Sequence, residues 1–410
     1  MLNQIGPPTL ADVTRAAEML EGVARKTPCL PSDVLSRLTG ANVVLKFENR
    51  QHTGSYKMRG AYIKLVSLDD RQRKTGVVTA SAGNHAQGTA FAALRLGIGS
   101  TIVMPEATPY CKIRETENYG ARVVLHGANI SDALAEADRI AYAEEKTLVV
   151  PFDDPAIVAG AGTVGLEMLQ AFCDLQVLLV QVGGGGLISG MALAAKSINP
   201  TIRVIGVQTV LYPGLYNVRH ALPPPVGAAT VAEGVAVATV GDLNLAMTET
   251  LVDDVLLVDE GAIEYAVHLL LEEEKTLVEG AGALGVAGLL KYSKRFHGLR
   301  VGLVLSGGNI DTGLLAYVVS RVRLRQHRVM CLRVQVLDAP GGLAKVADLV
   351  ARQGANVLEV SHRRVFTDAL AKCMQLDLTV ELRHPEDIYT IVQSLNAIGF
   401  DTVLPSEKSA

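Results

Sequence analysis

The sequence predicts an α/β protein of two lobes with open, mostly parallel sheets, followed by a small C-terminal α+β domain. Up to about residue 320, short apolar runs typical of strands alternate with helical stretches, as in parallel layered folds. Aromatic residues make up only 4% of the 410 residues and Trp is absent, so the cores must consist of Val, Leu, Ile and Ala, which buried parallel strands favour. After residue 328 the pattern changes to a short, compact series of strand-like and helix-like runs.

The first 320 residues hold eight runs that we predict to be strands, with helices between them. Eight strands exceed the usual size of one sheet, so we expect two α/β lobes that face a shared cleft. In a catalytic region of residues 1–325, the smaller lobe (about 48–150) would be inserted in the larger one. The predicted strands are 43–47, 77–79, 100–104, 122–126, 147–150, 177–181, 203–207 and 301–305, and clear helices are 86–96, 130–145 and 187–196.

Residues 326–410 are expected to form a separate domain. The basic run RVRLRQHR (321–328) precedes it, either as a linker or as the solvated end of a helix. A helical stretch stops at Gly354, where a C-terminal glycine belongs. The elements follow the order β-α-β-β-α-β, the ferredoxin-like split βαβ plan. We assign them to 331–337, 343–353, 356–365, 372–381, 386–398 and 401–404.

Composition and charge exclude several classes of protein. The net charge is −4 and Lys and Arg are scattered, so no nucleic-acid-binding surface is expected. The first 21 residues lack the basic and apolar regions of a signal peptide, and no apolar run approaches the ~20 residues of a membrane span. The five cysteines form no C-x-x-C pair, so we expect reduced thiols and no metal site. These features predict a cytoplasmic protein without a membrane partner.

The first candidate for chemistry is Lys57, within SYKMRG (55–60). The preceding Thr-Gly-Ser predicts a turn in which Ser55 caps a helix that continues from Tyr56. Lys57 would then lie in the first helical turn, where the positive end of the helix dipole lowers the pKa of its amine. A lysine that forms a Schiff base needs such a pKa. An ordinary surface lysine is the alternative at this point.

A loop of small residues, SAGNH (81–85), follows the predicted strand 77–79 and precedes a helix. Such a turn exposes several backbone N–H groups, which suit a carboxylate. Asn84 can donate a hydrogen bond to a phenolate-like oxygen without adding formal charge. His85 suits a helix start as well as a catalytic role, and an ordinary connecting loop is the alternative for the whole segment.

The run GGGGL (183–187) lies between an apolar strand and a helix and is the strongest local signal in the chain. Four glycines cost conformational entropy and are poor choices for a passive turn. At a helix N-terminus they let the backbone wrap closely around a phosphate. The dinucleotide pattern G-x-G-x-x-G lacks its third glycine, and no Gly-Lys-Ser/Thr of a Walker motif follows. The run therefore predicts a monophosphate site.

The last loop, SGGN (306–309), follows strand 301–305 and presents the hydroxyl of Ser306 to a cleft. Strand C-termini are where α/β sheets place ligands. Four such loops, which include a phosphate site and a lysine at a helix start, suit a phosphorylated aldehyde cofactor.

Taken together, these motifs resemble those of the threonine ammonia-lyase (threonine dehydratase) family. That family has the tryptophan-synthase-β-like fold called pyridoxal-phosphate (PLP) fold type II. The tail, LDAPGGLAKVADLVARQGANVLEV (337–360), resembles an ACT domain, a small-molecule-sensing module. The resemblance covers most of 20–320 and rests on GSYKMRGAY (54–62), SAGNHAQG (81–88), GGGGL (183–187), TVAEGVAV (230–237), EGAGALG (279–285) and SGGN (306–309).

The resemblance assigns a role to each motif. Lys57 matches the lysine that binds PLP covalently, and Tyr56 stands where the family usually has a Phe that lines the cofactor. Ser306 matches the partner of the pyridine nitrogen, and Asn84 the residue that reaches the ring oxygen. The substrate carboxylate would bind at Ser81, Ala82, Gly83, Asn84 and His85, and the phosphate at Gly183, Gly184, Gly185, Gly186 and Leu187.

The implied reaction eliminates water from a hydroxy-amino acid, so that threonine gives 2-oxobutanoate and ammonia and serine gives pyruvate and ammonia. The amino acid would displace Lys57 from the cofactor, and the freed amine would take the Cα proton. A serine at the pyridine nitrogen leaves the ring largely neutral, which favours elimination over reprotonation or transamination.

Three other activities compete with this interpretation. Serine racemases share the fold, but they carry a serine where this chain has Ala82, and they have a divalent-cation pattern where it has Gln208, Thr209 and Gly214. An amino-acid sensor with an inert catalytic lobe and a cysteine-synthase-like β-replacement enzyme are the other two. The intact Lys57 argues against the sensor, and the ACT-like tail argues against the β-replacement enzyme.

For the tail, the resemblance implies allosteric control by an amino acid such as isoleucine or valine. The glycine-rich turn of Pro340, Gly341, Gly342 and Leu343 is the expected effector site. The Arg usual in this turn is replaced by Ala339, which leaves the effector's identity open. A purely oligomerising module is the alternative, and fold type II enzymes imply a homodimer or homotetramer.

Overall fold

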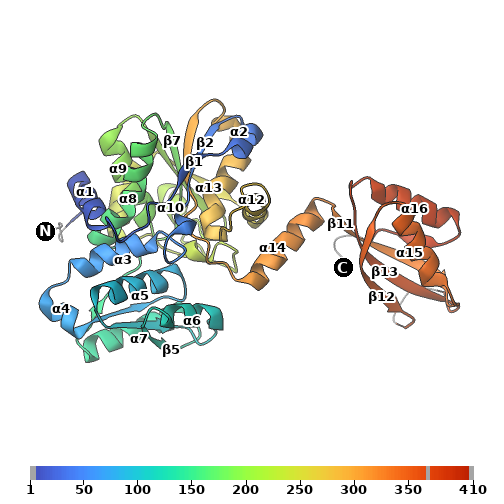
Figure 1. Ribbon diagram of the computed structural model, residues 1–410, viewed down its shortest axis with the longest axis horizontal. Coiled ribbons are helices and arrows are strands. Elements are labelled where there is room, and N and C mark those ends of the chain that lie inside the picture. Colours follow the sequence, from blue (N-terminus) through green and yellow to red (C-terminus); the bar gives the residue numbers. More distant parts are fainter. Residues whose placement is uncertain (1–5, 366–369, 406–410) are drawn as a thin grey trace. The chain divides into compact units, whose positions relative to one another are not determined.

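The computed structural model describes residues 6–365 and 370–405, and the chain divides into two compact units between Leu314 and Leu315 (Figure 1). This division lies within helix α14 (Thr312–Arg325). The basic run 321–328 is therefore largely the end of a helix and not a linker. Within the two described ranges, no helix has the length and apolar character needed to cross a membrane.

The larger sheet of the first unit has the strand order β1-β2-β10-β7-β8-β9. Its five strands from β2 to β9 are parallel, and only the edge strand β1 pairs antiparallel with its neighbour β2, in agreement with the predicted mostly parallel sheet. Strand β1 has three residues and ends at Pro31, which lacks an N–H and so suits a sheet edge. The strands are β1 (Cys29–Pro31), β2 (Asn42–Lys46), β7 (Val177–Gln181), β8 (Arg203–Thr209), β9 (Asp254–Val258) and β10 (Arg300–Val304).

The smaller sheet, in the order β5-β4-β3-β6, is entirely parallel. Its strands come between β2 and β7 in the chain, so the two sheets form the two lobes that the eight predicted strands required. Strands β3 and β4 are buried at every position because helices cover both faces. The strands are β3 (Val77–Ala80), β4 (Ser100–Met104), β5 (Arg122–Leu125) and β6 (Thr147–Leu148).

The helices of this unit pack closely where glycines allow backbones to meet. A Cβ atom on Gly190 of α9 would lie 2.3 Å from the carbonyl oxygen of Val158 in α8, so no larger residue fits there without a shift. Helix α3 lies between α5 and α8 (Figure 1). Besides α14, the helices are α1 (Leu10–Met19), α2 (Asp33–Thr39), α3 (Lys57–Val66), α4 (Asp70–Thr75), α5 (Asn84–Leu96), α6 (Tyr110–Glu117), α7 (Ile130–Ala143), α8 (Pro155–Ala171), α9 (Gly186–Ile198), α10 (Gly214–Arg219), α11 (Asp242–Leu251), α12 (Glu260–Glu272) and α13 (Gly280–Lys291), with 3-10 turns η1 (Glu48–Arg50), η2 (Glu233–Val235) and η3 (Ser293–Arg295).

The second unit has an antiparallel sheet in the order β12-β13-β11-β14, and its elements follow the predicted β-α-β-β-α-β order. Alternate residues of β11 (Leu332, Val334 and Val336) are buried against apolar residues of both helices, as a sheet with one covered face requires. After the end of α14, the elements are β11 (Val329–Leu337), α15 (Gly342–Arg352), β12 (Asn356–Arg363), β13 (Cys373–Glu381), α16 (Asp387–Ala397) and β14 (Asp401–Val403).

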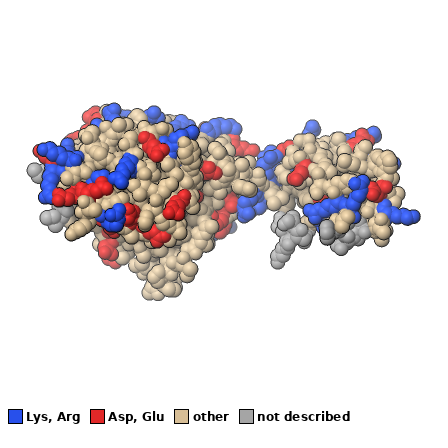
Figure 2. Space-filling model, turned by 90° about the horizontal axis from the view of Figure 1, so that it is seen from below, with Lys and Arg blue, Asp and Glu red and all other residues tan. Residues whose placement is uncertain are grey.

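Figure 2 shows Lys and Arg interspersed with Asp and Glu on the visible face of the first unit. Charge of one sign is therefore not gathered into a single patch on that face.

Candidate active site

The predicted site residues of the first unit come from loops at the C-terminal ends of parallel strands. In the larger sheet, β10 lies between β2 and β7. The segments that lead to Lys57, to Ser306 and to the glycine run therefore follow three adjacent strands. The carboxyl edge of such strands is where open α/β sheets bind ligands.

Lys57 is the first residue of α3, and its amine is partly buried. Its Nζ atom donates a hydrogen bond of 2.8 Å to the carbonyl oxygen of Pro151. Burial lowers the pKa of this amine to about 8, although the nearby carboxyl of Glu279 acts in the opposite direction. A substantial fraction of Lys57 is thus neutral just above physiological pH, and the neutral amine is the form that attacks a carbonyl.

The predicted helix cap before Lys57 is wrong. Tyr56, not Ser55, is the N-cap residue of α3, and no side chain caps the helix. Instead, the backbone of Ser55 pairs with Gly307, and the N–H of Tyr56 donates to the carbonyl oxygen of Ser306 at 3.0 Å. The start of α3 is therefore held by the SGGN loop, which brings Lys57 beside Ser306. The Tyr56 ring lies below the amine, with its centroid 5.5 Å from Nζ.

The loop 81–85 lies at the start of α5, which begins at Asn84. Its first four residues are partly exposed, whereas His85 is buried. The Nε2 atom of His85 lies 3.1 Å from the carbonyl oxygen of Val149. Burial, together with the charge of Lys57, lowers the pKa of His85 to about 3, so the ring is neutral and supports the smaller lobe. The unpaired N–H groups of the helix start suit a carboxylate.

Asn84 is held from two sides. Its Nδ2 donates to Oε1 of Glu279 at 2.6 Å, and its Oδ1 accepts from Nδ2 of Asn309 at 2.8 Å. Burial raises the pKa of Glu279 to about 7, while the hydrogen bond from Asn84 and the amines of Lys112 and Lys57 lower it. Glu279 therefore changes its protonation state near neutral pH, beside the candidate catalytic lysine.

The glycine run forms a cradle at the start of α9. Gly185 has a φ of +95°, a left-handed conformation that favours glycine. A Cβ atom on Gly184 would lie 2.3 Å from ring atoms of Phe152, so the run can carry no side chain here. The amide of Asn244 donates to the carbonyl oxygens of Gly184 and Phe152 at 3.1 and 3.0 Å and fixes the loop. Backbone N–H groups at a helix start, free of side chains, fit a phosphate.

The site as a whole fits a phosphorylated aldehyde. It combines an amine of lowered pKa, a phosphate cradle at a helix start and a buried serine, Ser306, whose side chain adds no charge. The hydroxyl of Ser55, which is buried two residues before Lys57, has no hydrogen-bond partner within residues 6–365 and 370–405. These observations agree with a phosphorylated aldehyde that binds between these residues.

Several residues of the site were not identified from the sequence. Glu279 belongs to the EGAGALG segment (279–285), which supported the family resemblance, but no role was predicted for its carboxylate. Pro151, Phe152 and Asn244 carry no local signal, because their contacts involve residues far away in the chain.

The predicted effector turn lies in the second unit. Gly341 has a φ of +88° and is the N-cap residue of α15. Pro340, Gly341 and Ala339 are exposed, and the side chain of Leu343 is 40% exposed. The turn therefore offers a helix start and an accessible apolar side chain.

Comparisons with known proteins agree with this geometry. The L-threonine ammonia-lyase of Thermotoga maritima is 42% identical over 389 residues, which cover 94% of this chain and 97% of that protein. Threonine deaminase isoform 2 from Solanum lycopersicum has a TM-score of 0.73 and 32% identity, covering 79% of this chain and 92% of that one. Maize serine racemase has a TM-score of 0.72 and 32% identity, covering 78% and 99%.

Residues 20–307 match the family described as "Pyridoxal-phosphate dependent enzyme". This match includes Lys57, the 81–85 loop, the glycine run and Ser306. The chain therefore belongs to the family of pyridoxal-phosphate-dependent enzymes.

Proposed function

We propose that this enzyme is a threonine ammonia-lyase, which converts L-threonine into 2-oxobutanoate and ammonia, and L-serine into pyruvate and ammonia. The observation that carries the proposal is the amine of Lys57, which has a pKa of about 8 and lies beside the SGGN loop. The 42% identity to a threonine ammonia-lyase, over 97% of that protein, supports the same reaction.

In this proposal, some residues of the first unit bind the cofactor and Lys57 transfers a proton. Bound PLP supplies an electron sink for the bonds that break at the substrate. Lys57 would hold the cofactor, and its neutral amine would accept the proton of the substrate's Cα. The phosphate would bind at Gly183, Gly184, Gly185, Gly186 and Leu187, at the start of α9, and Tyr56, whose ring lies by the amine of Lys57, would line the cofactor ring.

The remaining site residues orient the substrate and set the charge around it. Ser81, Ala82, Gly83, Asn84 and His85 form the carboxylate site, in which backbone N–H groups at the start of α5 contact the anion. Asn84, which Glu279 and Asn309 orient, would donate to the ring oxygen of the cofactor. Ser306 would offer the pyridine nitrogen a neutral hydroxyl, which would favour loss of the β-hydroxyl over reprotonation.

The experiment is steady-state turnover of the PLP-loaded protein with L-threonine and L-serine, followed through 2-oxo acid and ammonia. Lys57→Ala should abolish both turnover and the visible absorbance of bound PLP, whereas Lys74→Ala, at an exposed lysine of α4, should change neither. Absence of 2-oxobutanoate from the wild-type protein would refute the proposal. Turnover of O-acetylserine with sulfide in its place would favour a β-replacement enzyme, and a protein that binds no PLP would favour a sensor.

A serine racemase is the second candidate, because maize serine racemase has the same fold. Racemisation needs an acid on the face of Cα opposite Lys57. The methyl side chain of Ala82, which stands where racemases carry a serine, cannot donate a proton. We therefore expect little D-serine from L-serine. D-serine formation at a rate comparable to pyruvate formation would contradict this expectation.

We further propose that residues 326–410 form an ACT domain that controls activity by binding an amino acid at Pro340, Gly341, Gly342 and Leu343, in a homodimer or homotetramer. The β-α-β-β-α-β order and the exposed turn support this role. Isoleucine and valine should change the KM for threonine in the full-length enzyme, and Leu343→Glu should remove that response. An unchanged KM with both amino acids would support a module that only assembles subunits, and the mass in solution would give its order.

A further inference from the structure

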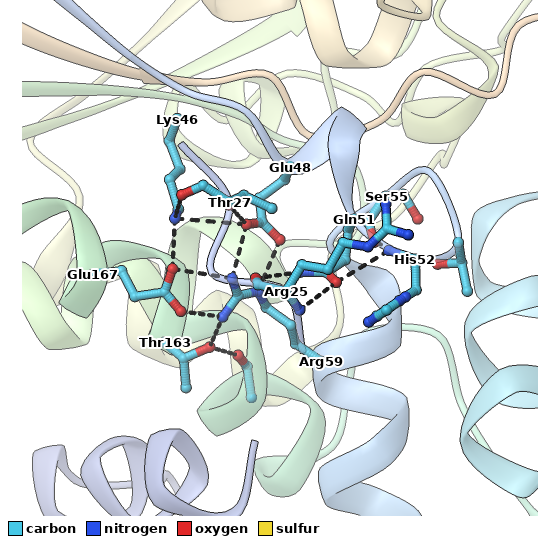
Figure 3. A network of polar contacts seen from close by, with 12 residues as sticks. Arg25, Thr27, Lys46, Glu48, Gln51, His52, Ser55, Arg59, Thr163 and Glu167 are labelled. Atoms are coloured by element: carbon cyan, nitrogen blue, oxygen red, sulfur yellow. Dashed lines mark hydrogen bonds and ion pairs between the residues drawn. The ribbon is translucent and has the colours of Figure 1, made fainter. Parts of the chain in front are cut away.

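Arg59 is fully buried and uses all of its hydrogen-bond donors (Figure 3). Its Nε and Nη2 atoms donate to the two oxygens of Glu48, both at 2.8 Å. Its Nη1 donates to Glu167 at 2.6 Å and to Thr163 at 3.1 Å, and Nη2 also reaches Glu167 at 3.1 Å. A guanidinium has five N–H groups in one plane, so this set of contacts fixes its position in three dimensions.

The charges around Arg59 are balanced. Lys46 donates to Glu167 at 2.5 Å and lies 3.9 Å from Glu48, so two cations meet two carboxylates. Thr27 also donates to Glu48 and supports the cluster from the chain before β1 (Figure 3). A buried cluster of this kind is weak evidence for stability but strongly constrains geometry, because every member needs its partners.

The cluster consists of the three partners of Arg59, which are Glu48, Thr163 and Glu167, and of Lys46, which pairs with the two carboxylates. All four belong to the larger lobe. Lys46 ends β2, Glu48 lies in η1, and Thr163 and Glu167 lie on α8. Arg59 itself is two residues after Lys57 on α3, and two residues turn an α-helix by about 200°. The side chains of Arg59 and Lys57 therefore project from opposite faces of the helix. The cluster contacts one face of the first turn, and the lysine amine lies on the other.

Two glycine contacts prevent α3 from moving sideways. A Cβ atom on Gly88 of α5 would lie 3.0 Å from the backbone carbon of Lys57. A Cβ atom on Gly60, the neighbour of Arg59, would lie 2.8 Å from the carbonyl oxygen of Ile157 in α8. The backbone of helix α3 thus packs directly against α5 and α8. These contacts leave rotation about the helix axis and translation along it, which the cluster of Arg59 restricts.

We propose that Arg59 is a positioning residue for Lys57, which fixes the first turn of α3 to β2, η1 and α8 so that the lysine amine is held in line with the glycine run. The larger lobe carries both α8 and the glycine run, and α8 and α9 are in backbone contact at Gly190. The amine and the phosphate cradle then keep a constant separation. This inference rests on the proposed role of Lys57 as the residue that holds PLP.

The test compares Arg59→Lys and Arg59→Met with the wild type and with Arg300→Met, which removes an exposed Arg–Asp174 pair of the larger lobe as a matched control. The first readout is the rate at which added PLP becomes attached to Lys57, followed by visible absorbance in the absence of substrate. We expect attachment at least tenfold slower in Arg59→Lys, because lysine keeps the charge but lacks the planar fork. The pH at which that absorbance titrates should also shift, while Arg300→Met should match the wild type.

The second readout is the split between kcat and KM for threonine in folded, PLP-saturated protein. A misplaced amine should lower kcat at least tenfold and change KM by about twofold or less. If Arg59→Met does not fold, Arg59→Lys and Glu167→Gln still test the inference, since both keep most of the cluster. A folded Arg59→Lys enzyme with wild-type attachment rate, absorbance and kcat would overturn it. If the wild type does not turn over threonine, the proposed function fails, but the attachment rate still tests Arg59.

Discussion

The Nδ2 atom of Asn84 lies 2.6 Å from Oε1 of Glu279, and this hydrogen bond joins the smaller lobe to the residue that precedes α13 in the larger lobe. Asn309 donates to the other end of the same amide at 2.8 Å. The amide of Asn84 thus has one orientation, with its nitrogen toward a carboxyl whose pKa is raised to about 7 by burial. The protonation of Glu279 is therefore expected to affect both stability and the site.

The first prediction concerns the pH dependence of stability. Because the pKa of Glu279 is raised from 4.5 to about 7, the folded protein binds a proton that the unfolded chain has released in this range. The contribution of Glu279 to stability should therefore fall as pH rises from 4.5 to 7, by about 3 kcal/mol at most, while His85, whose pKa burial lowers to about 3, contributes in the opposite direction. Glu279→Gln should remove this fall in cofactor-free protein. Urea unfolding at pH 5 and pH 8 measures the free energy of unfolding of the wild type and of Glu279→Gln. An identical pH dependence in these two proteins would show that Glu279 makes no such contribution.

The second prediction concerns the phosphate cradle. A Cβ atom on Gly184 would lie 2.3 Å from the ring of Phe152, so Gly184→Ala must displace this ring or the loop. Such overpacking costs about 1–3 kcal/mol. We expect the Kd for PLP to rise at least tenfold in a fluorescence or absorbance titration. Gly99→Ala is the control, since a Cβ atom there meets nothing within 4 Å, and its Kd should equal that of the wild type. Equal Kd values for both variants would contradict a close-fitting cradle.

The third prediction concerns an ion pair between the lobes. Lys112 of α6 and Glu233 of η2 are 2.7 Å apart, and both influence the pKa of Glu279. Glu233 is 60% exposed, so the pair contributes little energy and is screened by salt. Glu233→Gln should raise KM for threonine by about twofold at low salt and leave it unchanged in 1 M NaCl. The control is Glu117→Gln, at an exposed residue of α6. A KM change that persists in high salt would point to a role other than ion pairing.

The fourth prediction concerns the second unit. Leu376 of β13 is fully buried in that unit's own core, and Leu→Ala changes in cores cost about 2–5 kcal/mol. Leu376→Ala should lower the temperature at which residues 315–410 unfold but keep the turnover measured without effector. Calorimetry and steady-state assays measure the two effects. Leu358→Ala, at an exposed leucine of the same sheet, should change neither. A loss of basal turnover in Leu376→Ala would show that the first unit depends on the second.

Much of the fold could be predicted because the signals are local. All eight predicted strands of the first unit are present, with ends shifted by two residues at most, since each contains a short run of apolar residues. Two strands were missed. β1 has only three residues and pairs antiparallel, so it shows no distinct pattern. β9 (Asp254–Val258) has an apolar Val-Leu-Leu-Val run like those of the predicted strands but was not assigned.

The candidate site was predictable to the extent that backbone chemistry defines it. Glycines at a helix start and a lysine at another helix start are readable from one segment each. In contrast, the role of Arg59 depends on Glu48 and on Glu167, which is 108 residues away. Likewise, the Ser55 cap was predicted from local preference, but pairing with Gly307 took its place. Contacts between distant segments leave no local trace in a single sequence.

The position of β10 has a consequence for the order in which the enzyme is made. Strand β10 pairs with both β2 and β7, so these two strands have no common neighbour until residues 300–304 emerge from the ribosome. Synthesis proceeds from the N-terminus, so a strand that pairs with a distant later strand cannot complete its sheet until that later strand has been made. A nascent chain therefore carries Lys57 for about 250 further residues before the site can close around it. We therefore expect the cofactor to bind late in the maturation of this protein, after β10 has joined the sheet.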